Sequence, residues 1–179
     1  MFLILLGPKG SGKSFIGSLL EERLGIRFVA VEPLWKAYFR RCAAAGTPPD
    51  IGAGIGVVHP LICRALAEFQ HLAVETTGAS GPILADLLNL APRDQTLIIR
   101  VRAPIALCLS RIASRDPAAH IPVDEATIRQ AHALSEAVDI APDLEISNVD
   151  ASADALAHEL ELGLRRAGLL RAARPSMPG

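Results

Sequence analysis

The sequence predicts an α/β fold in which one five-stranded parallel sheet carries helices on both faces. Three observations predict this fold. Short, continuous apolar runs recur along the chain, as in strands that are buried on both sides. A segment with apolar residues at helical spacing follows each run, so strand and helix alternate. Half of the 179 residues are hydrophobic and only 4% are aromatic, so a core of Leu, Ile, Val and Ala is expected.

The first half of the chain supplies three strands and four helices. Apolar runs predict strands over residues 2–6, 26–31 and 72–75. Helical spacing predicts helices over residues 14–24, 34–45, 57–70 and 82–90. Gly25 is placed to end the first helix, and Pro33 to begin the second. Residues 46–56, GTPPDIGAGIG, are rich in Gly and Pro and are expected to form a loop.

The second half completes the alternation. Strands are predicted over residues 96–101 and 144–147, and helices over residues 104–115, 124–137 and 152–167. Asp124 and Ser152 are expected N-caps, and Gly168 is expected to stop the last helix. The chain is therefore expected to form one domain over residues 1–170, with a disordered tail over residues 171–179.

In such a sheet the carboxyl ends of all strands meet at one edge, where ligands bind. The loops after Leu6, Val31, Glu75, Val101 and Ser147 are thus the expected site.

The first of these loops carries a phosphate-binding motif. Residues 7–14, GPKGSGKS, match G-x-x-x-x-G-K-[ST] in full, between an apolar strand and an amphipathic helix. Its glycines let backbone N–H groups turn inward toward phosphate oxygens, and the helix adds its positive end. The expected nucleotide-binding residues are Gly7, Pro8, Lys9, Gly10, Ser11, Gly12, Lys13 and Ser14, with Phe15 beside the base. The alternative is a glycine-rich turn with an incidental lysine.

Lys13 and Ser14 have separate expected tasks. The Lys13 ammonium is placed to reach the β- and γ-phosphates of ATP, and the Ser14 hydroxyl to ligate Mg²⁺.

Composition excludes several classes of protein. A net charge of −1 disfavours broad nucleic-acid binding. The three cysteines are far apart and lack metal spacing, which favours reduced thiols in the cytoplasm. The apolar N-terminus lacks a basic leader and breaks at Gly7, and no other uninterrupted apolar run is long enough to span a bilayer. We expect no membrane association.

With this motif and element order, the chain resembles the small P-loop kinases, which include shikimate, gluconate and adenylate kinases, from residue 1 to about residue 168. The resemblance implies a P-loop NTPase fold with a lid near residues 112–124. It also implies ATP- and Mg²⁺-dependent phosphoryl transfer to the hydroxyl or phosphate of a small metabolite or nucleoside.

The resemblance assigns roles to two acids. Glu32 follows the second strand, where it would be the catalytic base or part of the magnesium shell; the alternative is an exposed acid at a helix start. Glu75 ends the third strand and would serve the metal, since TLIIRV ends without the carboxylate of a Walker B strand. Thr76 and Thr77 resemble an acceptor-holding loop, or form an ordinary turn.

Three further residues follow from the resemblance. Arg111 and Arg115 are four residues apart on the helix that leads into the lid. Arg115 would stabilise the transferring phosphoryl group and Arg111 would cover adenine; the alternative is a solvated basic helix end. Asn148, after the fifth strand, would lie beside adenine.

Between residues 34 and 58 lies the segment that binds the acceptor in this group. Trp35, Tyr38, Arg40 and Arg41 suit an anionic or ring-containing acceptor, or else form one packed helix face with the arginines in water. His59 precedes Pro60 at a predicted helix start, where a structural role is favoured.

The leading hypothesis is a small-molecule kinase, active as a monomer or homodimer. Two alternatives stay open: a regulatory NTP-binding ATPase module and a polynucleotide 5′-end kinase. The absence of N-K-x-D from the sequence disfavours a guanine-specific switch.

Overall fold

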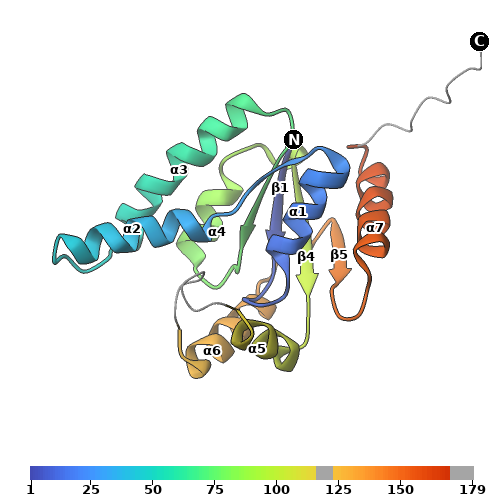
Figure 1. Cartoon of the computed structure of the whole chain (residues 1–179). Helices are drawn as coiled ribbons and strands as arrows, with labels where there is room; N and C mark the ends of the chain where they lie inside the picture. The colour runs from blue at the N-terminus through green and yellow to red at the C-terminus, as the bar shows by residue number, and fades with distance from the viewer. Residues whose placement is uncertain (116–122, 170–179) are drawn as a thin grey trace, which may run out of the picture.

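The computed structural model describes residues 1–115 and 123–169, which form a sheet covered by helices (Figure 1). The strands are β1 (Phe2–Leu6), β2 (Arg27–Val29), β3 (Leu72–Thr76), β4 (Thr96–Arg102) and β5 (Leu144–Ser147). They form one five-stranded sheet in the order β2-β3-β1-β4-β5, and every neighbouring pair is parallel. The predicted fold class is confirmed, with β1 at the centre.

The helices follow the strands as expected. They are α1 (Lys13–Leu24), α2 (Glu32–Ala44), α3 (Ile51–Glu68), α4 (Gly81–Leu88), α5 (Ile105–Ala113), α6 (Glu125–Glu136) and α7 (Ala153–Arg166), with a short 3-10 helix at Arg93–Gln95 that was not predicted. Asp124 and Ser152 are N-caps, since their side chains accept hydrogen bonds from the backbone N–H groups of Thr127 and Ala155 at 2.8 and 3.2 Å.

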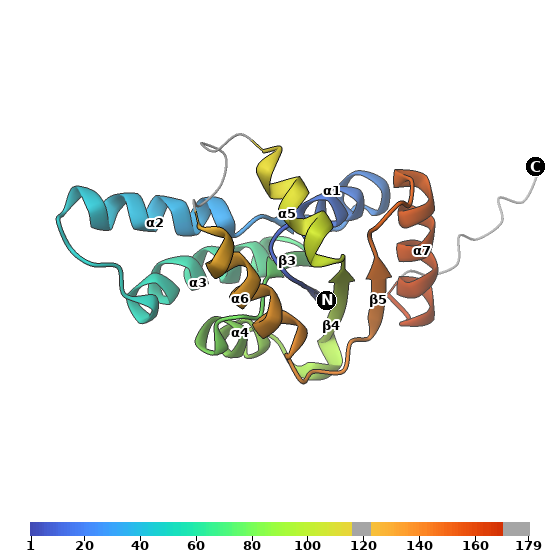
Figure 2. The same ribbon diagram turned by 90° about the horizontal axis from the view of Figure 1, so that it is seen from below.

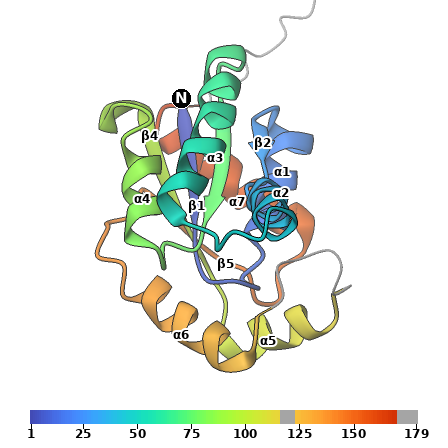
Figure 3. The same cartoon turned by 90° about the vertical axis from the view of Figure 1, so that its left-hand side faces the viewer.

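Side chains of β1 alternate between two cores. Leu3 and Leu5 pack with the inner faces of α1 and α7. Phe2 and Ile4 pack with side chains of α2, α3 and α4 on the other face. Figure 3 shows α4 on one side of the strands and α1 on the other. Because β1 is buried on both sides, it reads as an unbroken apolar run.

Helices α5 and α6 contact each other at the edge where the strands end (Figure 2). Strand β5 and helix α7 lie at one side of the molecule, and helices α2 and α3 extend outward at the other side (Figures 1 and 2). The edge that carries the phosphate-binding loop therefore lies between these two groups of helices.

The prediction of a loop over residues 46–56 holds for residues 46–50 and is wrong for residues 51–56, because α3 begins at Ile51. Asp50 caps the helix, with its carboxylate 2.7 Å from the backbone nitrogen of Ala53. A Cβ atom on Gly54 would lie 2.2 Å from the Trp35 ring. Gly54, one of the glycines that suggested a loop, instead lets α2 and α3 approach closely.

Helix α3 is long and apolar enough to cross a membrane by length and composition alone, with a mean hydropathy of 1.3 and 17% of its residues buried. The sequence was expected to contain no segment long enough to span a bilayer, and α3 corrects that expectation by length and composition. One such helix is weak evidence for a membrane protein. Its His59 Nδ1 lies 2.8 Å from Asp86 Oδ1 of α4, and the helix contacts both α2 and α4.

Candidate active site

The phosphate-binding loop joins β1 to α1 at the carboxyl edge of the sheet. Gly10 and Gly12 have φ angles of 86° and 96°, a region that favours glycine. A Cβ atom on Gly10 would lie 2.6 Å from the Cys108 carbonyl oxygen, and one on Gly12 would lie 2.0 Å from Asn148 Nδ2. The loop therefore needs glycine both for its curl and for its close contact with neighbouring segments.

The Lys13 side chain folds back over this loop. Its Nζ donates hydrogen bonds to the carbonyl oxygens of Gly7 and Pro8 at 2.8 and 2.9 Å. Burial lowers the pKa of the Lys13 ammonium from 10.5 to about 8, against the opposing effect of the Glu75 carboxylate. A bound polyphosphate would replace the carbonyl partners with anionic ones.

Ser14 and Glu75 lie together. The Ser14 hydroxyl donates a hydrogen bond to Glu75 Oε2 at 2.9 Å, because β3 pairs with β1 and sets Glu75 opposite Leu5. Among residues 1–115 and 123–169, no cluster of three or more acidic, His or Cys side chains could hold a metal alone. Mg²⁺ is commonly held by one or two protein groups together with substrate phosphates, so this pair fits such a role.

Glu32 is the first residue of α2. Its Oε1 lies 3.3 Å from Lys9 Nζ, which joins the phosphate-binding loop to the start of this helix. Glu32, Glu75, Lys13 and Arg115 all line one cavity of about 290 Å³. Residues predicted for catalysis and metal binding are thus brought together.

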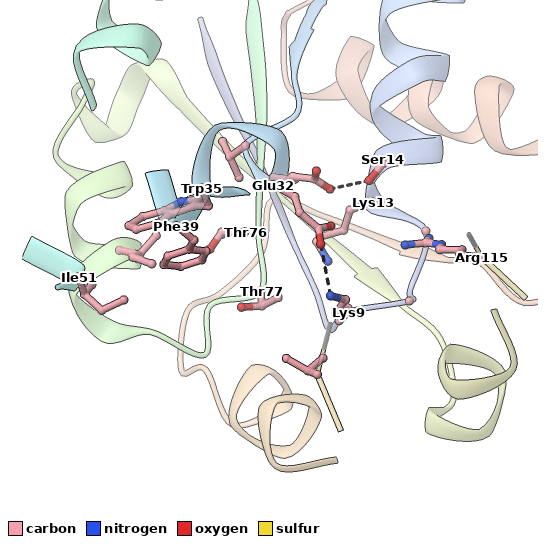
Figure 4. Close-up of a pocket in the computed structure, with 16 residues that line it drawn as sticks. Lys9, Lys13, Ser14, Glu32, Trp35, Phe39, Ile51, Thr76, Thr77 and Arg115 are labelled. Atoms are coloured by element: carbon pink, nitrogen blue, oxygen red, sulfur yellow. Dashed lines mark hydrogen bonds and ion pairs between the residues drawn. The ribbon is translucent and has the colours of Figure 1, made fainter. Parts of the chain in front are cut away.

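The other side of the same cavity is apolar. We define the apolar wall as Val31, Trp35, Phe39, Ile51 and Ile83. Figure 4 shows Trp35, Phe39 and Ile51 on one side, and Lys9, Lys13, Ser14 and Arg115 on the other. The rings of Trp35 and Phe39 pack with centroids 5.8 Å apart. Phe39 was missed in the sequence, although its position four residues after Trp35 on one helix was a usable signal.

The remaining acceptor candidates lie elsewhere. The Tyr38 hydroxyl donates to the Asp50 carbonyl at 2.7 Å and accepts from the Asp50 N–H at 3.0 Å, so it fastens α2 to the start of α3. Arg40 and Arg41 are exposed and do not line the cavity. The structure therefore favours the packed-face interpretation for these three residues.

Asn148 and Arg111 hold the loop from the β4–β5 side. Asn148 Nδ2 donates to the Ser11 carbonyl at 2.9 Å. Arg111 contacts the same carbonyl at 3.4 Å and the Val149 carbonyl at 3.5 Å. Neither residue lines the cavity, and Phe15 is 45% exposed outside it. Asn148 and Arg111 thus contact the phosphate-binding loop, and the predicted contacts of these three residues with the base stay predictions.

Thr76, the last residue of β3, and Thr77 begin a tight turn at the cavity. Thr76 Oγ1 accepts a hydrogen bond from the Gly78 N–H, and Thr77 Oγ1 accepts one from the Ala79 N–H. Both line the cavity. Residues 116–122 of the predicted lid lie outside the described residues, so the lid stays a prediction.

Comparison with known sequences gives partial matches. No family model matches the chain. Shikimate kinases of Synechococcus elongatus and of Synechococcus sp. are 31% identical to it over 110 residues. The match covers 62% of this chain and 56% of each relative, so it spans little more than half the length of either.

Solved structures match over nearly the whole chain. A shikimate kinase from Acinetobacter baumannii in complex with shikimate has a TM-score of 0.61 at 20% identity, covering 95% of both chains. A shikimate kinase from Aquifex aeolicus has a TM-score of 0.63 at 19% identity, covering 94% of this chain and 99% of that one. A gluconokinase from Sinorhizobium meliloti has a TM-score of 0.58 at 17% identity, covering 92% and 91%. The chain therefore has the fold of the P-loop small-molecule kinases, the group that its sequence resembles.

Proposed function

We propose that this protein transfers the γ-phosphoryl group of ATP, bound with Mg²⁺, to the hydroxyl or phosphate of a small metabolite or nucleoside. One observation carries the proposal: a single cavity joins the phosphate-binding loop and two carboxylates to an apolar wall. A phosphate donor at the loop and an acceptor at the apolar wall would thus bind side by side in this cavity.

In this proposal the chain binds and orients both reactants. The loop N–H groups and Lys13 hold the phosphates, while Ser14 and Glu75 hold the magnesium ion. Bound Mg²⁺ would supply charge neutralisation on the phosphate oxygens. Arg115 lines the phosphate side of the cavity and adds positive charge there.

Glu32 is proposed as the group that accepts the proton of the acceptor hydroxyl. It lines the cavity between the phosphate-binding loop and the apolar wall. Lys9 holds its carboxylate from the loop side at 3.3 Å. A positioned carboxylate of this kind typically contributes a factor of about 10² to 10⁴ to the rate.

The setting of the reaction belongs to the same proposal. Cys42, Cys63 and Cys108 are free thiols, which agrees with a reducing cytoplasm. We propose a cytoplasmic enzyme that works as a monomer or homodimer.

The test uses Lys13→Ala and Glu32→Gln in the full chain, with Arg40→Ala as a matched exposed control. ADP release and phosphorylated product are measured with ATP, Mg²⁺ and a panel of alcohols, sugars, shikimate, gluconate and nucleosides. We expect acceptor-dependent transfer that both site variants lose and the control retains, while circular dichroism shows all three folded. Phosphoryl transfer by Lys13→Ala at the wild-type rate would contradict the proposal. ATP hydrolysis without any acceptor would instead favour a regulatory ATPase module.

A further inference from the structure

The apolar wall brings together side chains from three helices and one loop. Trp35 and Phe39 come from α2, Ile51 opens α3, Ile83 lies in α4, and Val31 precedes α2. Trp35 is only 8% exposed, since its ring also packs into the core beneath α2 and α3. An acceptor bound here would lie against hydrocarbon and aromatic surface.

The positive groups of the cavity lie at its phosphate end and already have partners. Lys13 is hydrogen bonded to the loop carbonyls, and Lys9 is paired with Glu32. Arg115 lies beside the loop, away from Phe39 and Ile51 (Figure 4). Bound phosphates would pair with these three cations, so none of the three is placed to pair with an anionic acceptor at the apolar wall.

Within residues 1–115 and 123–169, Lys9, Lys13 and Arg115 are the basic side chains that line the cavity. Among the residues that the structure describes, Lys36, Arg40 and Arg41 of α2 do not line the cavity. Residues 116–122, DPAAHIP, lie outside the described residues and contain His120 but no Lys or Arg. A carboxylate held against the wall would therefore be desolvated without a cation, which is costly.

The polar side chains beside the apolar wall are suited to bind the uncharged hydroxyl groups of an acceptor. Thr76 and Thr77 each use the hydroxyl oxygen to accept a backbone N–H, which leaves the O–H able to donate one hydrogen bond. Glu32 is an acceptor for a hydroxyl proton.

We propose that the acceptor is a small, uncharged alcohol with an apolar ring or branched body, and that carboxylate-bearing acceptors are disfavoured. This inference rests on the proposed function. The acceptor's hydroxyl oxygen forms a bond to the γ-phosphorus of ATP, and the bond from that phosphorus to the β–γ bridging oxygen breaks. The hydroxyl proton passes to Glu32, and the products are ADP and an uncharged alcohol's phosphate monoester.

The test compares 3-hydroxycyclohexane-1-carboxylate with its methyl ester, two probes that share ring and hydroxyl and differ in charge. Transfer from ATP is measured with the full chain and Mg²⁺, by ADP release and mass spectrometry of the phosphate ester. We expect kcat/KM for the ester to exceed that for the acid by at least about tenfold, equivalent to about 1.4 kcal/mol. Equal values, or a preference for the acid, would overturn the inference and leave the kinase proposal standing.

A variant pair tests whether the wall sets this preference. Ile51 lines the cavity yet is 41% exposed, so Ile51→Arg adds a cation at a tolerant position. Leu61→Arg, on the same helix at 47% exposure and outside the cavity, is the control. Ile51→Arg should raise kcat/KM for the acid about tenfold, and Leu61→Arg should leave both probes unchanged. If Ile51→Arg does not alter the preference, the wall does not set it and the inference fails.

Binding without turnover separates the two proposals. Trp35 is the sole tryptophan of the chain, so its fluorescence reports occupancy of the wall directly. If the ester alters the fluorescence at a tenfold lower concentration than the acid, and neither probe nor any member of the acceptor panel is phosphorylated, the acceptor class stands and the kinase proposal fails. If neither probe alters it, the inference is overturned.

Discussion

Lys9 Nζ lies 3.3 Å from Glu32 Oε1, so the third residue of the phosphate-binding loop is paired with the first residue of α2. The two side chains are 17% and 31% exposed. An ion pair so open to solvent contributes little to folding, about 1 kcal/mol or less. Its consequence is positional, since it fixes the proposed base beside the proposed phosphate site.

Lys9→Met should lower kcat about tenfold and change the free energy of unfolding by less than about 1 kcal/mol. The reason is that the Glu32 carboxylate loses the partner that orients it. Steady-state kinetics and urea titration measure the two effects. Glu32→Gln combined with Lys9→Met should be no slower than Glu32→Gln alone; multiplicative losses would show that Lys9 does not act through Glu32.

Glu75→Gln should raise the Mg²⁺ concentration needed for half-maximal activity by about tenfold. The Ser14 hydroxyl would keep a hydrogen-bonding partner, but the site would lose one negative charge. Activity is measured across a Mg²⁺ titration at saturating ATP. The exposed Glu68→Gln is the control, and an unchanged midpoint in Glu75→Gln would remove Glu75 from the metal site.

Lys13 should make stability depend on pH. Its pKa is about 8 in the folded protein and 10.5 in the unfolded chain, so between these values the unfolded chain binds more protons and stability rises with pH. The free energy of unfolding should rise by up to about 3 kcal/mol more in the wild type than in Lys13→Met across this window. Urea titrations at stepped pH measure the difference. Parallel curves for the two proteins would contradict it.

Gly54 and Gly56 should respond oppositely to alanine. A Cβ atom at Gly54 would lie 2.2 Å from the Trp35 ring, whereas at Gly56 it would meet nothing within 4 Å. Gly54→Ala should therefore cost about 1 to 3 kcal/mol of stability and shift Trp35 fluorescence. Gly56→Ala should stabilise α3 by about 0.5 to 1 kcal/mol. Thermal unfolding with fluorescence detection compares them, and equal effects would show that the close helix contact is absent.

The parts of the fold that follow from local signals could be predicted closely. Strand β1 and the start of α1 agree with the sequence to within one residue, because an unbroken apolar run and a glycine-rich loop are both local features. The start of α3 could not be predicted in this way. Asp50 is a local cap signal, but the glycines that follow it favoured a loop, and the Trp35 ring that packs on Gly54 belongs to another helix.

The same distinction holds for the candidate site. Glu32 and Glu75 were selected through the resemblance to the small P-loop kinases, at strand ends that share one edge of a parallel sheet. Phe39 was missed, and Tyr38 was considered instead, because the rotation of α2 decides which aromatic ring faces the cavity. That rotation is set by the docking of Tyr38 on Asp50, which joins separate elements.

The apolar wall has one further consequence, for the way in which substrate preference is encoded. All five of its residues fall between positions 31 and 83, whereas the phosphate-binding loop ends at Ser14. The apolar wall and the phosphate-binding loop are therefore encoded in separate stretches of the gene, although Glu32 and Glu75 lie within the stretch that encodes the wall. Replacing residues 31–83 by those of a homologue should exchange the accepted alcohol only if the homologue also supplies carboxylates at the positions of Glu32 and Glu75.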